Sequence, residues 1–135
     1  MSGSVLIAED EPYILESLMF LMSRAGYRVR AERDGAKAVE AAIQSRPDLL
    51  ILDIMMPTLN GFEALKQLRA TPGLEALQVL VLTAKGQEAD RQGMMALGAD
   101  GFITKPFSNQ DLLTTVKALI SGEPAPEGQA QPDDG

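Results

Sequence analysis

The stretch "LLILDIMMP", Leu49 to Pro57, ends an aliphatic run with a bare carboxylate, that of Asp53. A continuous aliphatic run is typical of a strand covered on both faces, as the central strands of parallel sheets are. Aspartate is a poor strand former and is costly to bury without a partner. Because a lone strand-end aspartate is most simply a turn residue, the interpretation of Asp53 depends on which other side chains reach the same place.

Working outward from this run, short apolar segments alternate with longer segments of helical spacing. The apolar runs are Ser4–Ala8, Tyr27–Ala31, Asp48–Leu52, Gln78–Leu82 and Gly101–Thr104. The run "YRVRA" alternates in polarity, which indicates an edge strand with one solvated face. Strict alternation of strands and helices implies right-handed crossovers and a parallel sheet. The sequence therefore predicts an α/β fold of three layers, with a five-stranded, doubly wound parallel sheet at its centre.

The first turns of the helical segments carry capping signals. Pro12 stands where a first-turn proline is tolerated, and Gly86 to Leu97 forms the fourth helical segment. The expected capping residues are Asp34, Asn60 with Glu63, and Ser108 with Asp111. Side-chain oxygens at these positions satisfy the backbone N–H groups that a helix leaves free at its start.

Composition excludes several classes of chemistry. The 135 residues contain no cysteine and no histidine, which removes thiol catalysis, disulfides, histidine-based triads and imidazole–zinc sites. The formal net charge of -7 argues against direct nucleic-acid binding. The N-terminus does not resemble a signal peptide and no apolar run is long enough to span a membrane, so a cytoplasmic location is expected.

Polar residues that can carry chemistry follow the predicted strands at their carboxyl ends. They are Glu9, Asp10 and Glu11 after the first strand, Asp53 at the end of the third, Thr83 at the end of the fourth, and Thr104 and Lys105 at the end of the fifth. Each has an ordinary explanation when taken singly, such as a turn, a helix dipole or a solvated loop. In open α/β sheets, however, ligands bind beyond the carboxyl ends of the strands. The coincidence at one edge therefore favours a functional site.

The residue types at this edge point to phosphoryl chemistry. Carboxylates of Glu9, Asp10 and Asp53 would repel one another, and a divalent cation relieves that repulsion. With oxygen ligands alone, magnesium is the expected metal. A carboxylate held between a cation and the ammonium of Lys105 is placed to attack a phosphoryl group, and Thr83 offers a hydroxyl to one of its oxygens. The set predicts an aspartyl-phosphate site.

Over residues 4 to about 120 the chain resembles a response regulator receiver domain of the chemotaxis-regulator type. The resemblance is carried by "AEDE", "DIMMPTLNG", "VLTA" and "FITKPF", in this order and at these spacings. It implies a flavodoxin-like sheet with strand order 2-1-3-4-5. It also implies a phosphoryl-accepting signalling domain that catalyses its own phosphorylation and dephosphorylation but is not otherwise an enzyme.

The resemblance implies a role for individual positions. Asp53 is the phosphoacceptor, and magnesium is held by Glu9, Asp10, Asp53 and the backbone carbonyl of Met55. Thr83 and Lys105 contact the phosphoryl group. Phe102 is the aromatic switch that packs inward when Thr83 moves toward that group. The Lys105–Pro106 peptide bond is expected to be cis. Met55 and Lys85 occupy positions that tune the lifetime of the phosphoryl group in this family.

The resemblance implies the partners, and the proline-, glycine- and acid-rich composition after residue 120 indicates the domain limit. Because the chain has no histidine, the phosphoryl group must come from another protein, a sensor histidine kinase or a histidine phosphotransfer protein. The output would be a downstream protein or a lost effector domain, reached through the face of the fourth helix, fifth strand and fifth helix. Gly101 and Thr115 replace charged residues of the family's dimer face, so a monomer or weak dimer is expected. Residues 1–120 are expected to form the domain and 121–135 a disordered acidic tail or linker.

Alternatives remain at this stage. A phosphoaspartate hydrolase of the haloacid dehalogenase type would need a second aspartate where Met55 stands. A flavodoxin would need a phosphate loop after the first strand, whereas "EDEPY" would repel a phosphate. A degenerate receiver used as a protein-binding scaffold is also possible, although no signature residue has been lost.

Overall fold

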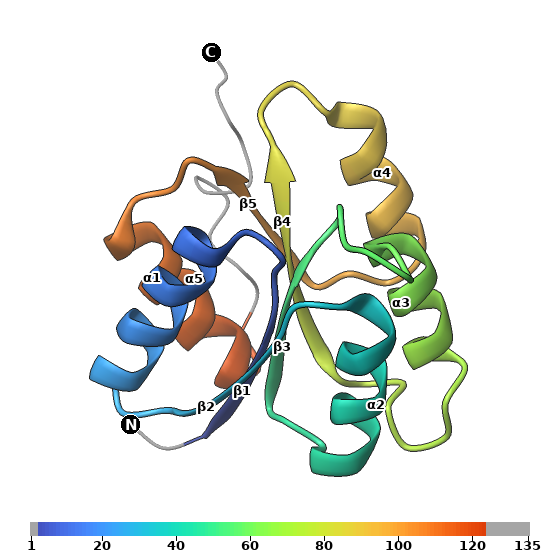
Figure 1. Ribbon diagram of the computed structural model, residues 1–135, viewed down its shortest axis with the longest axis horizontal. Coiled ribbons are helices and arrows are strands. Elements are labelled where there is room, and N and C mark those ends of the chain that lie inside the picture. Colours follow the sequence, from blue (N-terminus) through green and yellow to red (C-terminus); the bar gives the residue numbers. More distant parts are fainter. Residues whose placement is uncertain (1–2, 124–135) are drawn as a thin grey trace.

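The computed structural model describes residues 3–123, which form a parallel sheet between two layers of helices (Figure 1). The strands are β1 (Ser4–Ala8), β2 (Arg28–Glu32), β3 (Leu49–Asp53), β4 (Gln78–Ala84) and β5 (Gly101–Lys105). The helices are α1 (Pro12–Arg24), α2 (Gly35–Ser45), α3 (Gly61–Arg69), α4 (Glu88–Ala96) and α5 (Asn109–Ile120). The strand order is β2-β1-β3-β4-β5, with every neighbouring pair parallel. The predicted fold class and strand order are confirmed.

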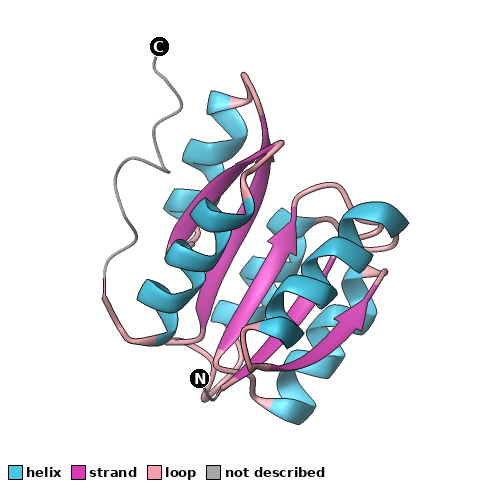
Figure 2. Cartoon of the chain, turned by 90° about the vertical axis from the view of Figure 1, so that its left-hand side faces the viewer, coloured by secondary structure: helices cyan, strands magenta, loops and turns pink. Residues whose placement is uncertain are grey.

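Alternate residues of each strand point to opposite faces of the sheet, and each face has its own apolar core. Helices α1 and α5 cover one face, where Ile7, Ile51 and Leu82 are buried. Helices α2, α3 and α4 cover the other face, packing on residues such as Leu50 and Val81. Figure 2, turned by 90° from the first view, shows the strands between helices on both sides. Because both faces of β3 are covered, all five of its residues are buried.

Asp53, Thr83 and Lys105 belong to the strands themselves and do not follow them as loop residues. Asp53 pairs with Leu82 in the β3–β4 ladder, and Ala84 pairs with Lys105 in the β4–β5 ladder. The predicted runs stopped one or two residues short, because a polar residue at the end of an apolar run hides the continuation of the backbone ladder. Helix α4 likewise begins at Glu88 instead of Gly86. The backbone of Asp53 and Lys105 is therefore held by the sheet itself.

The predicted capping residues start their helices. The Asp34 carboxylate accepts a hydrogen bond from Lys37 N–H at 3.0 Å, and the hydroxyl of Ser108 accepts from Asp111 N–H at 3.0 Å. Asn60 and Glu63 form the reciprocal capping box of α3, and Pro12 is the first residue of α1.

The edge position predicted for the alternating run is confirmed, because β2 pairs with β1 alone and none of its residues is fully buried. None of the described helices is both long enough and apolar enough to cross a bilayer. Most of the predicted tail, residues 124–135, lies outside the described residues.

Candidate functional site

Three strands deliver charged side chains to one point at the carboxyl end of the sheet. Glu9 directly follows β1, Asp53 is the last residue of β3, and Lys105 is the last residue of β5. Glu9 is 1% exposed and Asp53 is 6% exposed. Burial of two carboxylates is costly unless a positive charge accompanies them.

Lys105 supplies that charge to both carboxylates. Its Nζ lies 3.1 Å from Asp53 Oδ1, where it donates a hydrogen bond, and 3.2 Å from Glu9 Oε1. Burial is the largest single effect on Lys105 and lowers its pKa, but the charges of Asp53 and Glu9 and the hydrogen bond to Asp53 together outweigh it, so the pKa lies above its ordinary value. The lysine is therefore an ammonium at neutral pH. Two carboxylates share one ammonium, which leaves a negative charge at the site.

The two carboxylate oxygens of Glu9 differ in the hydrogen bonds that they accept. Its Oε2 accepts a hydrogen bond from Glu11 N–H at 2.9 Å. Its Oε1 is buried and, among residues 3–123, has an ion pair with Lys105 but no hydrogen-bond partner. Burial raises the pKa of Glu9, and the charge of Asp53 raises it further, beyond what the Glu11 N–H and Lys105 offset. A buried carboxylate oxygen that accepts no hydrogen bond can accommodate an additional cation. Because a carboxylate oxygen is a hard ligand, magnesium is a suitable cation.

The three carboxylates expected to hold magnesium, those of Glu9, Asp10 and Asp53, are not all in contact in this structure. Asp10 is exposed and takes no part in the contact between Glu9, Asp53 and Lys105. Within the described range 3–123, no three acidic side chains are grouped so that they could hold a metal ion by themselves. A magnesium ion commonly uses one or two carboxylates and keeps several waters. The metal roles of Asp10 and of the Met55 carbonyl therefore remain predictions.

The residues expected to sense the phosphoryl group, Thr83 and Phe102, lie on β4 and β5. Thr83 is 4% exposed and pairs with Thr104 across β4 and β5. Phe102 is buried in the core under α2, α3 and α4, and the guanidinium carbon of Arg91 lies 4.9 Å from the centre of its ring. The ring of Phe102 is thus buried in this structure, and its role as a switch stays a prediction. Lys105 and Pro106 are joined by a cis peptide bond, the geometry that the resemblance implied.

The loop after Asp53 is tied down at several points. Gly61 N–H donates to the carbonyl of Ile54 at 2.7 Å, and the Thr58 hydroxyl donates to Asp34 Oδ1 at 2.8 Å. Thr58 has a φ of 64°, in the left-handed region that non-glycine residues rarely adopt. A Cβ at Gly35 would overlap the carbonyl oxygen of Leu59, so only glycine lets α2 approach this loop. These contacts fix the course of the segment that carries the Met55 carbonyl.

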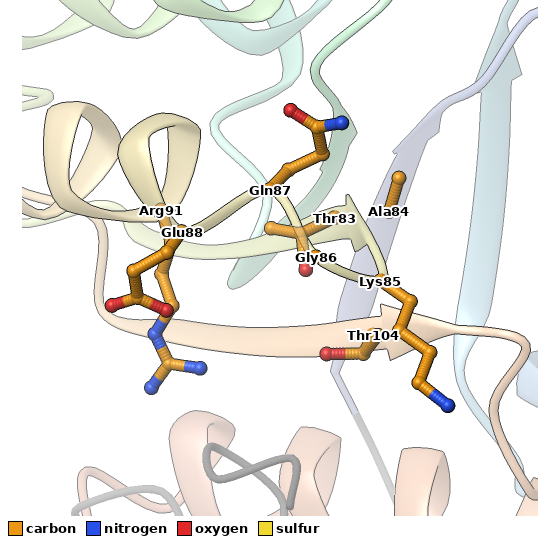
Figure 3. Close-up of a pocket in the computed structure, with 8 residues that line it drawn as sticks. All are labelled: Thr83, Ala84, Lys85, Gly86, Gln87, Glu88, Arg91 and Thr104. Carbon is orange, nitrogen blue, oxygen red and sulfur yellow. The ribbon is translucent and has the colours of Figure 1, made fainter.

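Two cavities share lining residues from the segment that connects β4 to α4. The first, of about 380 Å³, contains Asp53 and Lys105 in its wall together with Met55, Gln87 and Asp90. The second, of about 260 Å³, is shown in Figure 3 and is lined by Thr83, Lys85, Glu88, Arg91 and neighbouring residues. In that view the Gln87 side chain points away from those of Glu88 and Arg91. Ala84 and Gln87 line both cavities.

Sequence reasoning missed Gln87 and Asp90 as residues of the Asp53 cavity. Acidic residues in the first turn of a helix are common because they complement the helix dipole, so Asp90 carried no signal of its own. It reaches the site because α4 packs over the end of β4, a placement that only the tertiary structure reveals.

The comparisons with known proteins agree with this geometry. The sequence profile of the response regulator receiver domain matches residues 5–117. The chain therefore belongs to the response regulator receiver domain family.

The chain is similar to several known response regulators and receiver domains. The chain is 40% identical over 120 residues to the response regulator MprA of Mycobacterium ulcerans (strain Agy99), covering 89% of this chain and 51% of that protein. The chemotaxis response regulator CheY4 of Vibrio cholerae is 31% identical, with a TM-score of 0.83 and coverage of 88% of this chain and 99% of that one. The receiver domain of the sensor histidine kinase PA1611 from Pseudomonas aeruginosa PAO1, solved with a magnesium ion in its active-site cleft, is 27% identical, with a TM-score of 0.83 and coverage of 90% and 99%. The chain spans about half the length of the curated relatives it matches.

Proposed function

We propose that this receiver domain accepts a phosphoryl group on Asp53 from a phosphohistidine of a sensor histidine kinase or a histidine phosphotransfer protein. The observation that supports this most strongly is the placement of Lys105. Its ammonium lies within 3.1 Å of Asp53 Oδ1 and 3.2 Å of Glu9 Oε1. A carboxylate that already faces an ammonium can gain a phosphoryl group while the charge developing on the transferred oxygens is neutralised.

In the transfer step, a carboxylate oxygen of Asp53 forms a bond to phosphorus as the phosphorus–nitrogen bond to the donor histidine breaks. The bonding electrons leave with the imidazole nitrogen, which takes up a proton to become neutral imidazole. Lys105 stays protonated throughout and contacts the phosphoryl oxygens. No proton has to leave Asp53, because the carboxylate is the reacting form.

Magnesium is the metal that the residues fit. Glu9, Asp10, Asp53 and the backbone carbonyl of Met55 would hold it, and the unsatisfied Oε1 of Glu9 is the structural reason to expect a second cation beside Lys105. The chemistry that magnesium supplies when bound is a divalent charge facing the oxygens of the phosphoryl group.

The output is proposed to use the face formed by α4, β5 and α5. Thr83 and Phe102 connect the site to that face: Thr83 lies on β4, which pairs with the strand that ends at Asp53, and Phe102 lies on β5, which ends at Lys105. Drawing Thr83 toward a phosphoryl group would alter the packing of Phe102 beneath Arg91. The recipient is a downstream protein or an attached effector domain, and the domain itself is proposed to be residues 1–120, acting as a monomer or weak dimer.

The experiment is labelling by a small phosphodonor, acetyl phosphate or phosphoramidate, with and without magnesium. Wild type should incorporate a phosphoryl group only with magnesium, and Asp53→Asn should incorporate none. Asp48→Asn is the matched control, since Asp48 is an exposed aspartate just before the start of the same strand. Equal stable labelling of wild type and Asp53→Asn would refute the assignment, and a wild type that binds no phosphoryl group would favour the scaffold alternative.

A further inference from the structure

The start of α4 forms one wall of the cavity that contains Asp53, and the polar side chains of this wall have no hydrogen-bond or ion-pair partner among residues 3–123. Gln87 caps α4 without a side-chain hydrogen bond, and Asp90 follows in the first turn. Both line the cavity together with Asp53 and Lys105. Asp90 is only partly exposed, yet it forms no ion pair or side-chain hydrogen bond with any residue of the described range 3–123.

The volume of this cavity exceeds what one phosphoryl group fills. It measures about 380 Å³, whereas a water molecule occupies roughly 30 Å³ in the liquid. A phosphoryl group is only a few times larger than water, so the phosphorylated site keeps room for solvent beside it. Water in that space would contact the α4 wall, where Asp90 is the charged group.

We propose that Asp90 positions the water molecule that hydrolyses the aspartyl phosphate, so that Asp90 sets the lifetime of the signal. The inference rests on the proposed function of Asp53. The Asp90 carboxylate accepts a hydrogen bond from the water and orients its lone pair toward phosphorus. The apolar side chain of Met55, 75% exposed at the same cavity, offers no such acceptor.

The step balances without any further reagent. The water oxygen forms a bond to phosphorus as the bond between phosphorus and the Asp53 oxygen breaks. The electron pair of that bond returns to Asp53 as carboxylate, and both water protons end on the released inorganic phosphate. Asp90 is not consumed and does not need to change its protonation state. Lys105 contacts the phosphoryl oxygens and then the restored carboxylate.

An ordinary explanation for Asp90 is that an acid in the first turn of α4 complements the helix dipole. Glu88 separates the two explanations, because it is the other acidic residue of that turn. Glu88 lines the second cavity and not the one that contains Asp53. Glu88→Gln therefore removes the same charge from the same helix end without touching the proposed water site.

The test is single-turnover hydrolysis. Wild type, Asp90→Asn, Asp90→Glu and Glu88→Gln are labelled with phosphoramidate, freed from donor, and followed with magnesium by phosphate release and by loss of the phosphorylated species. Labelling rates and thermal midpoints are measured for the same four proteins. Asp90→Asn should slow hydrolysis roughly tenfold, as expected for one lost hydrogen bond to a charged group in the transition state.

Several results decide the inference. It is supported if Asp90→Asn slows hydrolysis with little change in labelling rate, Asp90→Glu restores part of the loss, and Glu88→Gln behaves like wild type. It is overturned if Asp90→Asn hydrolyses normally, if Glu88→Gln slows hydrolysis equally, or if labelling and hydrolysis change by the same factor. A wild type that is not labelled at all overturns the proposed function as well, whereas labelled variants with unchanged hydrolysis overturn only the role of Asp90.

Discussion

Carboxylates at the two ends of the sheet differ in the hydrogen-bond donors available to them. At the amino end, Asp48 Oδ2 accepts a hydrogen bond from Ser4 N–H at 2.8 Å. Asp100 Oδ2 accepts one from Val79 N–H at 2.9 Å and pairs with Arg69 at 3.0 Å. At the carboxyl end, Glu9 and Asp53 share a single ammonium, and Glu9 Oε1 has no hydrogen-bond donor among residues 3–123.

The difference follows from the direction of the chain. Ser4 is the first residue of β1 and Val79 is the second residue of β4. At this end of a parallel sheet the strands expose backbone N–H groups, which can donate hydrogen bonds to a carboxylate. Strands leave carbonyl oxygens at their other ends, and these repel a carboxylate. Asp48 and Asp100 at the amino end therefore complete the fold, whereas the buried Glu9 and Asp53 at the carboxyl end depend on a cation. The same residue type is structural at one edge and available for chemistry at the other.

The largest stability effect should come from the amino end. Arg69 donates hydrogen bonds to three carbonyls and one carboxylate, those of Leu74, Leu77, Gly98 and Asp100. Arg69→Ala should lower the free energy of unfolding by about 2–4 kcal/mol, because it leaves several partly buried acceptors unpaired. Denaturant unfolding monitored by circular dichroism measures this.

The control for this change is Lys66→Ala on the same helix. Lys66 is exposed, and its loss should change stability by less than about 0.5 kcal/mol. If Arg69→Ala were no more costly than Lys66→Ala, the amino-end network would not hold the fold as described.

The second-largest effect should be an increase in the free energy of unfolding, whereas Arg69→Ala lowers it. Glu9→Gln should stabilise the metal-free protein at neutral pH by roughly 1–2 kcal/mol, because it replaces an incompletely paired buried carboxylate by a neutral amide. Burial raises the pKa of Glu9 in the folded chain, so its ionised form disfavours folding above that pKa. The gain should therefore vanish in acid, where Glu9 is protonated in both states.

The measurement is denaturant unfolding in EDTA and in magnesium. Magnesium should stabilise wild type more than Glu9→Gln, which isolates the role of the carboxylate in holding a cation. A variant that is less stable than wild type in EDTA, or equally stabilised by magnesium, would contradict the contrast between the two edges.

The smallest effect concerns Asp34, a partly exposed acid at the carboxyl end that does find hydrogen-bond donors. The hydrogen bond from Lys37 N–H lowers its pKa, and the bond from the Thr58 hydroxyl lowers it further. A lowered pKa contributes stability above the ordinary carboxyl value near pH ~4, and this stability is lost as the pH falls through the lowered pKa. Asp34→Asn should thus melt slightly below wild type at pH 7 and level with it in strong acid.

Thermal midpoints of both proteins between pH 7 and pH 2 test this. Asn is itself a good N-cap, so α2 should start normally in the variant. A difference that grows toward acid would show that the charge of Asp34 does not act through these hydrogen bonds.

Much of the fold could be predicted because it depends on local signals. The aliphatic runs, Pro12 and the caps at Asp34, Asn60 and Ser108 mark the elements directly, and alternation of strands and helices implies a parallel sheet. The strand order came instead from the resemblance, because periodicity does not say which strands are neighbours. Strand ends were misplaced by one or two residues where polar side chains continue a backbone ladder.

What the sequence by itself determined is the identity of the chemistry: carboxylates, one lysine and one threonine at strand ends, with no histidine or cysteine to offer another reaction. What only the tertiary structure decided is how those groups meet. It set Lys105 against both Glu9 and Asp53, left Asp10 outside that contact, and brought Asp90 from α4 into the cavity of Asp53. The physical reason is that residue types follow from local sequence, whereas distances and shared charge depend on packing between elements far apart in the chain.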